Sequence, residues 1–334
     1  MDDEGQSMKW ISCDLCGHLN YRKLYVTKER SFPIDGSFQL VTCTNCGLVY
    51  LNPQPESEEL RRHYPAEEYY AYQSGIEPTN IVDNEKLTLW RAIRNGILKP
   101  WSRILRTLQT ELEGEVAYLG PIHSGTKVLD VGCGVGDGLS FYQEQGASTY
   151  GVEINPKACE EGRRKGHHIF CGQLYEAGFE DAFFDIIRFK QSLEHMSSPK
   201  RILLEAYRIL KPKGRVWISL PNHDGIHARL FGKWFYAIES PRHLFGFAPS
   251  TMTRLLTQTG FQVDHLYTYS LPGGVCYSFE YWLNDHFVRT TPFFFSRVRV
   301  KWWYIAAEPV FFIPRIMTDS FNKGEILVAC ARKP

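Results

Sequence analysis

The sequence has no excess of charge of either sign. Its 334 residues include 38 lysines and arginines against 37 aspartates and glutamates, which gives a formal net charge of +1. This balance lacks the basic excess that usually marks a dedicated binder of nucleic acid or another polyanion. The chain also has no uncharged apolar run of about 18 residues or more, so no single helix is expected to span a bilayer.

An apolar leader is missing too, because the residues that follow Met1 are acidic and polar. The nine cysteines are therefore expected in a reducing compartment rather than in disulfides, and we expect a cytoplasmic protein. With 43% apolar and 22% charged residues, the composition is typical of a globular protein of two or three domains. Aromatic residues, at 14%, are in excess.

Four of the nine cysteines form two CxxC pairs, Cys13–Cys16 and Cys43–Cys46, each followed by a glycine. Two thiolates three positions apart on a tight turn can occupy two corners of a tetrahedron around a metal. Short strands with turns are predicted between the pairs and after them. We expect a zinc ribbon over residues 1–55 with these four ligands. Unrelated buried thiols, a redox CxxC and an iron site with the same ligands are alternatives.

Residues 56–120 are expected to connect this ribbon to the rest of the chain. Four tyrosines between residues 64 and 72 suggest either a surface loop with packing aromatics or a lid over a site. Over 85–112, apolar residues recur at helical spacing and the opposite face is basic. Such helices suit packing on the main domain or contact with anionic lipid.

From residue 121 to 334, strands alternate with helices, which indicates an α/β domain with a doubly wound, mostly parallel sheet. The segments KVLDVGC, STYGVEI, HHIFCGQ, FFDIIRFKQ and RVWISLPN read as strands, and GFQVDHLYTYS and GEILVACARK complete seven. Between the last two lies the 270–320 insertion, in which aromatic and basic residues mix. It suits membrane contact at the headgroup level, a dimer interface or a cover over a pocket.

The first of these strands runs into a glycine loop that opens a helix. Asp130 stands ahead of Gly132 and Gly134, and such glycines let the backbone approach a ligand closely. The next strand ends at Glu153, an acid placed to accept hydrogen bonds from two ribose hydroxyls. This pattern alone permits a nicotinamide dinucleotide, but an acid directly before the glycines is unusual in dinucleotide folds.

Three segments resemble the class I S-adenosylmethionine-dependent methyltransferases: VLDVGCGVGDGLSFYQEQGASTYGVEINP, FFDIIRFKQSLEHMSSPKRILLEAYRILKPKGRVWISLPN and PRHLFGFAPSTMTRLLTQTGF. The CxxC pairs and LVYLNPQP further resemble bacterial members with an N-terminal zinc ribbon, which often act on cell-surface sugars or secondary metabolites. The resemblance implies a Rossmann-like fold and S-adenosyl-L-methionine as cofactor. It also implies methyl transfer to an acceptor, for which we expect a hydroxyl of a small-molecule or lipid-linked sugar.

The resemblance also implies which residues hold the cofactor. The glycine loop cradles the methionine part, and the acid that ends the second strand binds the ribose. After the third strand, a glutamine carbonyl stands where the family often has an acid for the adenine amine. Residues after the fourth strand form the floor of the pocket. The expected cofactor residues are Asp130, Gly132, Gly134, Glu153, Gln173, Leu174 and Gln191, and the pair Glu194–His195 also matches the floor.

A hydroxyl acceptor must lose its proton, and a histidine of pKa about 6.5 is mostly neutral near neutral pH and can take it. Ligands of open α/β sheets lie beyond the carboxyl ends of the strands, which favours His195 and His223. The resemblance favours His243, because PRHL recurs in the subgroup, with Arg242 beside it as a binder of an anionic substrate. These three histidines are the expected catalytic group.

Two other classes of function stay open. A ribbon that grips nucleic acid would make the protein an RNA methyltransferase, although residues 13–46 carry no dense basic stripe. A non-catalytic scaffold that binds the cofactor is the other, although Asp130, the glycine loop and Glu153 are all present. A homodimer and contact of the 270–320 insertion with the inner face of the membrane are further expectations.

Overall fold

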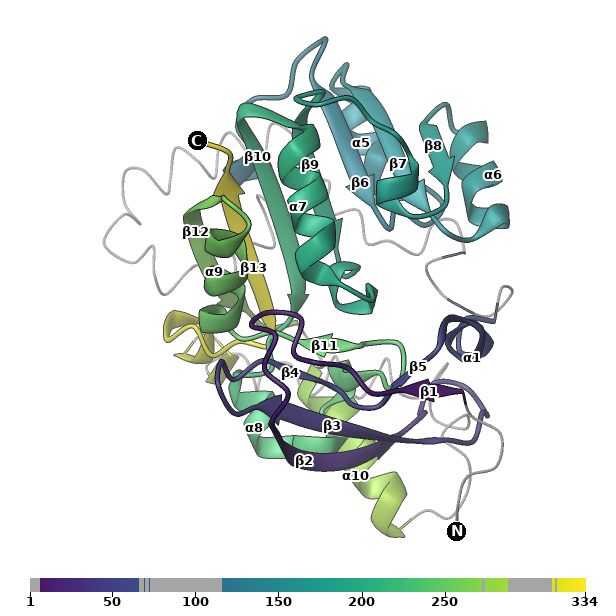
Figure 1. Ribbon diagram of the computed structural model, residues 1–334, viewed down its shortest axis with the longest axis vertical. Helices are drawn as coiled ribbons and strands as arrows, with labels where there is room; N and C mark the ends of the chain where they lie inside the picture. Colours follow the sequence, from purple (N-terminus) through teal and green to yellow (C-terminus); the bar gives the residue numbers. More distant parts are fainter. Residues whose placement is uncertain are drawn as a thin grey trace.

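The computed structural model describes residues 7–65, 69, 72, 116–271, 274–287, 314–315 and 317–334. The helices expected over 85–112 and most of the 270–320 insertion lie outside these residues. Figure 1 shows a large sheet with helices on both faces and a smaller sheet below it, built mainly from the amino-terminal strands. Among the described helices, none combines the length and apolar character needed to cross a membrane.

The large sheet has seven strands in the order β12-β13-β10-β9-β6-β7-β8. Only β13 runs antiparallel to its neighbours, β10 and β12. The expected doubly wound, mostly parallel sheet is therefore confirmed. Its strands are β6 (Lys127–Val131), β7 (Ser148–Glu153), β8 (His168–Cys171), β9 (Phe184–Lys190), β10 (Leu210–Pro221), β12 (Gln262–Tyr269) and β13 (Ile326–Arg332).

Local signals in the sequence start several of the helices. Proline occupies the first turn of α6, α7 and α9, where its missing N–H costs nothing. The side chains of Asn155 and Ser198 cap α6 and α7 by accepting backbone N–H groups. The helices are α1 (Ser57–Arg62), α4 (Val116–Leu119), α5 (Asp137–Glu144), α6 (Pro156–Arg164), α7 (Pro199–Ile209), α8 (Ile226–Phe231), α9 (Pro249–Gln258) and α10 (Gly274–Phe287), with the 3-10 turns η3 (Leu174–Glu176), η4 (Leu193–His195), η5 (Gly232–Trp234) and η6 (Tyr236–Ile238).

The smaller sheet has four strands in the order β11-β4-β3-β2, and it draws on two distant parts of the chain. β2 (Tyr21–Lys28), β3 (Ser37–Cys43) and β4 (Val49–Leu51) come from the amino-terminal segment. The fourth strand, β11 (Phe245–Gly246), follows His243 and pairs antiparallel with β4 (Figure 1). A separate pair joins β1 (Met8–Lys9) to β5 (Gln54–Pro55). The boundary expected at residue 55 is thus bridged by a strand from the main domain.

A buried ion pair reinforces this junction. Arg242 Nη1 lies 2.6 Å from Glu29 Oε2, with side-chain exposures of 1% and 0%. The same carboxylate oxygen contacts His63 Nδ1 at 3.0 Å, and Arg242 Nη2 donates to Ser31 Oγ. Burial opposes ionisation of Glu29, but His63 and Arg242 outweigh it and hold the pKa of Glu29 below its usual value. Arg242 therefore lies in an internal pair rather than at a surface open to an anionic substrate.

We expect the Arg242→Met substitution to lower the free energy of unfolding by about 3–5 kcal/mol, because it leaves Glu29 charged and buried without its cation. Denaturant unfolding measures this loss. The matched control is Arg164→Met, which removes an exposed arginine paired with Glu160 and should cost less than about 1 kcal/mol. Equal losses in the two variants would contradict the assignment.

Candidate functional site

The glycine loop after β6 has a backbone that only glycine adopts easily. Gly132 and Gly134 have φ angles of +79° and +53°. A Cβ added at Gly132 would lie 2.6 Å from Cβ of Ser192, so η4 packs directly on the loop. The N–H groups of Gly132 and Cys133 donate to the Val152 carbonyl at 2.8 and 3.2 Å. The loop is therefore fixed between β7 and η4 at the carboxyl edge of the sheet.

Glu153 closes the other side of this loop. Its Oε2 accepts the N–H of Gly134 at 3.0 Å, and its Oε1 accepts those of Ile154 and Asn155 at 2.8 and 2.9 Å. Burial raises the pKa of Glu153, and the three N–H bonds oppose that rise. Since each carboxylate oxygen accepts about two hydrogen bonds, one acceptor position remains on Oε2 for a ligand hydroxyl, where the sequence alone suggested two.

Asp130 lies beneath the loop in a buried pair that sequence reasoning missed. Its Oδ2 is 3.2 Å from Nη1 of Arg188, and both side chains are almost fully buried. The two residues face each other across the parallel strands β6 and β9. The available signal was an arginine inside the apolar run Ile186–Phe189. Asp130 thus pairs with the buried guanidinium of Arg188. Its expected contact with the cofactor remains a prediction.

The other expected cofactor residues line the same edge. Gln173 is exposed and Leu174 is buried, at the start of η3. The preceding Gly172 donates its N–H to the Glu153 carbonyl at 2.9 Å, which ties this turn to the loop. Gln191 has a φ of +50°, and its N–H donates to the carbonyl of Ser219 at 2.7 Å. The fold therefore collects these side chains at one rim, from the ends of β8 and β9.

The tyrosine-rich stretch also reaches this rim, although the sequence left its position open. Tyr72 lies against Glu153 and hydrogen-bonds Asn155, and burial raises the pKa of Tyr72. The rings of Tyr64 and Tyr69, and those of Tyr69 and Tyr72, meet edge to face at 5.0 Å. Tyr69 is buried, which both the packing of aromatics in a surface loop and a lid accommodate, so the lid stays a prediction.

Two of the three expected catalytic histidines lie together. The rings of His195 and His243 are 4.5 Å apart at 80°. His195 Nδ1 lies 3.1 Å from the Arg242 carbonyl and 2.9 Å from Tyr64 Oη, and His243 Nδ1 lies 2.9 Å from the Ala237 carbonyl. A carbonyl only accepts, which assigns the Nδ1 hydrogen and the Nε2 lone pair of His243. The Arg242 carbonyl favours the same tautomer for His195, whose Nδ1 also contacts a hydroxyl that can donate or accept. Burial lowers the pKa of each histidine to about 3, which keeps both neutral.

A carboxyl group faces these two imidazoles. Glu194 is 1% exposed, and neither of its side-chain oxygens has a hydrogen-bond partner among the described residues. One ligand atom from each of Glu194, His195 and His243 lies within 4.8 Å of the others. Burial raises the pKa of Glu194 to about 8, and the charge of Glu239 adds to the rise.

The third expected histidine, His223, lies behind this pair. Burial is the main cause of the low pKa of His243, and the nearby His223 lowers that pKa further. Burial lowers the pKa of His223 itself to about 4. Gly246 must be a glycine, because an added Cβ would lie 2.5 Å from His223 Nδ1. His227, in contrast, pairs with Glu325 at 2.7 Å and belongs to the packing.

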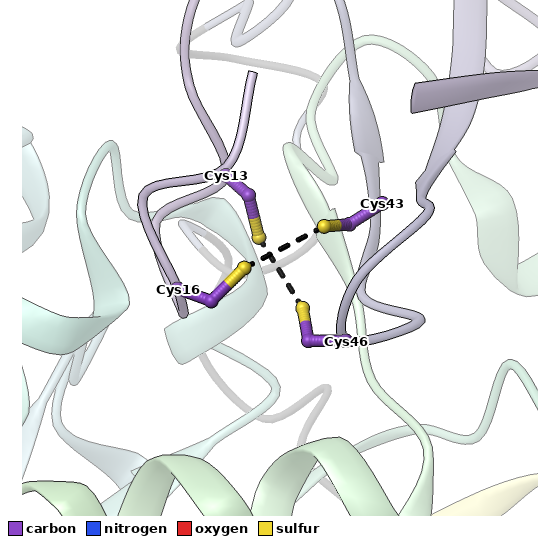
Figure 2. A group of neighbouring side chains, drawn as sticks. All are labelled: Cys13, Cys16, Cys43 and Cys46. Atoms are coloured by element: carbon purple, nitrogen blue, oxygen red, sulfur yellow. Dashed lines mark hydrogen bonds between the residues drawn. The ribbon is translucent and has the colours of Figure 1, made fainter. Parts of the chain in front are cut away.

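The four CxxC cysteines converge in the amino-terminal unit. Figure 2 shows their sulfurs pointing toward one centre, with Cys13 and Cys46 sulfurs 3.4 Å apart and those of Cys16 and Cys43 3.6 Å apart. A disulfide requires about 2.05 Å, whereas thiolates about 2.3 Å from a tetrahedral zinc ion lie just under 4 Å apart, roughly as seen here. The donor set and its spacing therefore fit zinc.

The first CxxC turn also contacts the main domain. Asp14 accepts hydrogen bonds from Ser198 Oγ at 2.6 Å and from the Lys200 N–H at 2.8 Å, at the start of α7. Ser198 lies three residues after His195. The turn that positions two of the sulfurs thus also holds the segment that carries a candidate catalytic side chain.

Known proteins resemble the chain across this site. Residues 104–266 match the family model described as a methyltransferase domain. The chain is 31% identical over 185 residues to a ubiquinone biosynthesis O-methyltransferase of Idiomarina loihiensis, covering 53% of this chain and 72% of that protein. The chain belongs to the S-adenosylmethionine-dependent methyltransferases. It is also 26% identical over 171 residues to a 27-O-demethylrifamycin SV methyltransferase of Amycolatopsis mediterranei, covering 46% of this chain and 63% of that relative, less than two thirds of its length.

Among solved structures, a methyltransferase from Archaeoglobus fulgidus matches with a TM-score of 0.45 and 19% identity, over 70% of this chain and 95% of that one. S-adenosylmethionine is the methyl donor of the family. The positive φ angles of Gly132 and Gly134 and the acceptor position left on Glu153 Oε2 fit the binding of a nucleoside.

Proposed function

We propose that this methyltransferase transfers the methyl group of S-adenosylmethionine to a hydroxyl oxygen of a sugar, glycolipid or related small molecule. The observation that carries the proposal is the buried group of neutral imidazoles, His195 and His243, beside the glycine loop. When bound, the donor supplies an activated methyl group on a sulfonium. The protein's main task is then to orient the acceptor, which can be worth roughly 7–11 kcal/mol.

Different residues at this edge of the sheet bind different parts of the methyl donor. The backbone of Gly132 and Gly134, above Asp130, holds the methionine part, and Glu153 Oε2 accepts a ribose hydroxyl. Gln173 and Leu174 take the adenine, and Gln191 forms the floor. The support is that all of these positions lie at or just after the carboxyl ends of β6, β7, β8 and β9, the edge at which open α/β sheets bind ligands.

The acceptor approaches from the side of the smaller sheet. A hollow of about 10 Å³, room for about one water molecule and partly open to solvent, lies between β2 and the segment 233–240. Its lining includes Lys28, Arg30, Lys233, Tyr236, Glu239 and Tyr281. Glu239 also lies 4.0 Å from His243 Nε2, so the hollow leads to the histidine group. Hydroxyl, phenol and charged groups around this hollow suit contact with one polar group of an acceptor such as a sugar.

A histidine of the group His195, His223 and His243 acts as the general base. Its imidazole takes the proton of the acceptor hydroxyl while the oxygen–carbon bond forms and the carbon–sulfur bond breaks. The support is geometric: the Nδ1 atoms of His195 and His243 contact backbone carbonyls, which favours a lone pair on Nε2.

We also propose that Cys13, Cys16, Cys43 and Cys46 hold a structural zinc ion. The supporting observation is the spacing of their sulfurs. Contact of the 270–320 insertion with the membrane, a homodimer and a cytoplasmic location remain predictions, because most of that insertion lies outside the described residues.

Purified protein supplied with methyl-labelled S-adenosylmethionine tests the activity. We expect label in a hydroxyl-bearing small or lipid-linked acceptor from a panel of nucleotide sugars, lipid-linked sugars and phenols, and none in bulk RNA. His195→Gln and His243→Gln should each lower kcat by roughly 10²–10⁴ with donor affinity unchanged. His168→Gln, at an exposed position of β8, is the control. Tight, steeply salt-dependent RNA binding with label in RNA would refute the proposed acceptor class.

A further inference from the structure

We propose that Glu194, His195 and His243 form a second metal site, which binds a divalent transition-metal ion on the acceptor side of the donor pocket. This site is separate from the four cysteines of the ribbon. It lies where η4 packs on the glycine loop, because Ser192, two residues before Glu194, donates its hydroxyl to the Val131 carbonyl at 2.6 Å.

The first argument is the carboxyl group of Glu194. It is 1% exposed, and among the described residues no donor reaches either oxygen. A buried carboxyl group normally has a hydrogen-bond partner or a cation, because burial without one is costly. The nearest described polar side chains with ligand atoms are the two histidines, which offer lone pairs rather than hydrogens. A cation between the three groups satisfies all of them.

The second argument is the orientation of the imidazoles. Metal-binding histidines usually donate their other ring N–H to a carbonyl or carboxylate, which fixes the ring and its tautomer. His195 and His243 both do so, through the carbonyls of Arg242 and Ala237. These two contacts are independent of each other. In both rings they leave the Nε2 lone pair as the one that can bind a metal ion.

The third argument is distance. Two donor atoms that each lie about 2.1 Å from one ion are at most about 4.2 Å apart. The three ligand atoms lie within 4.8 Å of one another. This spread is up to about 0.6 Å wider than one ion allows, so an ion would draw the three side chains slightly together.

The ligand set indicates the class of ion. Two imidazoles and one carboxylate suit Zn²⁺, Co²⁺, Mn²⁺ or Fe²⁺, whereas Mg²⁺ and Ca²⁺ prefer oxygen ligands alone. The charges near the site are mixed: Glu239 lies 4.0 Å from His243 Nε2 and also 3.4 Å from Arg242 Nε, and Arg242 pairs in addition with Glu29. Glu194 therefore has to bind the ion as a carboxylate, which the positive charge of the ion favours.

Three protein ligands leave coordination positions open, as in catalytic zinc sites, and an acceptor oxygen can occupy one of them. The catalytic use of the ion rests on the proposed methyl transfer, whereas its binding does not. With His195 and His243 as ligands, His223 is the member of the histidine group left to take the acceptor's proton.

Cobalt titration of the full-length protein tests the site in the absence of donor and acceptor. The ribbon is first loaded with one zinc ion per chain, so that its thiolates are occupied. We expect one further Co²⁺ per chain, detected by visible absorption without the intense near-ultraviolet band of a cobalt–thiolate bond. Glu194→Gln should weaken this Co²⁺ at least tenfold, and Glu160→Gln, an exposed acid of α6, should leave it unchanged.

Failure of the zinc-loaded wild type to bind Co²⁺, or equal affinity in Glu194→Gln, would overturn the site. Circular dichroism of Glu194→Gln shows whether its fold is kept, and His243→Ala provides a second variant that must also lose the ion. A protein that binds Co²⁺ but methylates no acceptor would refute the proposed function and leave the metal site standing. Methyl transfer that persists without this ion would refute its catalytic use.

Discussion

Glu153→Ala is expected to weaken S-adenosylmethionine binding at least tenfold. The substitution removes the carboxylate that would accept a ribose hydroxyl, and a hydrogen bond to a charged group contributes about 1.5–3 kcal/mol. It also leaves the N–H groups of Gly134, Ile154 and Asn155 without their acceptor. The glycine loop then loses one of its fixed points, so the effect should exceed that of a single lost contact. Calorimetric titration with S-adenosylmethionine measures the change.

Two further variants separate the causes. Glu153→Gln keeps the size of the side chain but directs an NH₂ group toward backbone donors, so it should weaken the donor as well. Glu160→Ala, on the exposed face of α6, serves as the control and should bind with wild-type affinity. The thermal midpoint of each variant shows whether the fold is kept. Unchanged affinity in a folded Glu153→Ala protein would remove the assignment of the ribose site.

Removal of zinc is expected to unfold the amino-terminal unit while the donor site survives. Zinc binding to structural thiolate sites contributes about 10–16 kcal/mol in zinc-finger peptides, more than a small four-stranded unit gains from its core. The loss should spread along contacts with the main domain that lie near the cysteines, through Asp14 to the start of α7 and through β4 to β11. Hydrogen exchange should therefore rise in residues 7–55 and also in 193–200 and 242–247.

The donor site provides the internal comparison for this experiment. The Glu153 carboxylate has no hydrogen bond to residues 7–55, so S-adenosylmethionine should still bind the chelated protein. Cys46→Ser should reproduce the effect of the chelator, and Cys171→Ser, a partly buried cysteine outside the cluster, should not. A rigid amino-terminal unit after proven metal loss would contradict the zinc assignment.

The main sheet could be predicted from the sequence because each signal was local. Apolar strands alternated with helices that began at proline, and the glycine loop followed a strand directly, so order and direction followed from known rules. The grouping of Cys13, Cys16, Cys43 and Cys46 was predictable for the same reason, since two short spacings define the two halves of the tetrahedron.

The acceptor side could not be predicted in this way, because it depends on pairs far apart in the chain. His195 meets Tyr64 across 131 positions, and Arg242 meets Glu29 across 213. Nothing in the spacing of these residues indicates the contact. Arg242 beside His243 suggested an anion site, whereas its true partner is a carboxylate of the amino-terminal unit. Arg188 was similarly hidden, since a single arginine in an apolar strand gives no sign of its partner.

The shared strand β11 has a consequence for the synthesis of this protein. Chains emerge from the ribosome amino terminus first, at about 5–20 residues per second, so all four cysteines are available early. Tyr50 of β4, however, pairs with Phe245 of β11. This edge of β4 therefore has no neighbouring strand until Phe245 has been synthesised. The nascent amino-terminal unit can therefore bind metal many seconds before its sheet is complete. During that interval the free edge of β4 is open to pairing with another chain, so we expect the growing chain to need chaperone protection until residues 245–246 have been added.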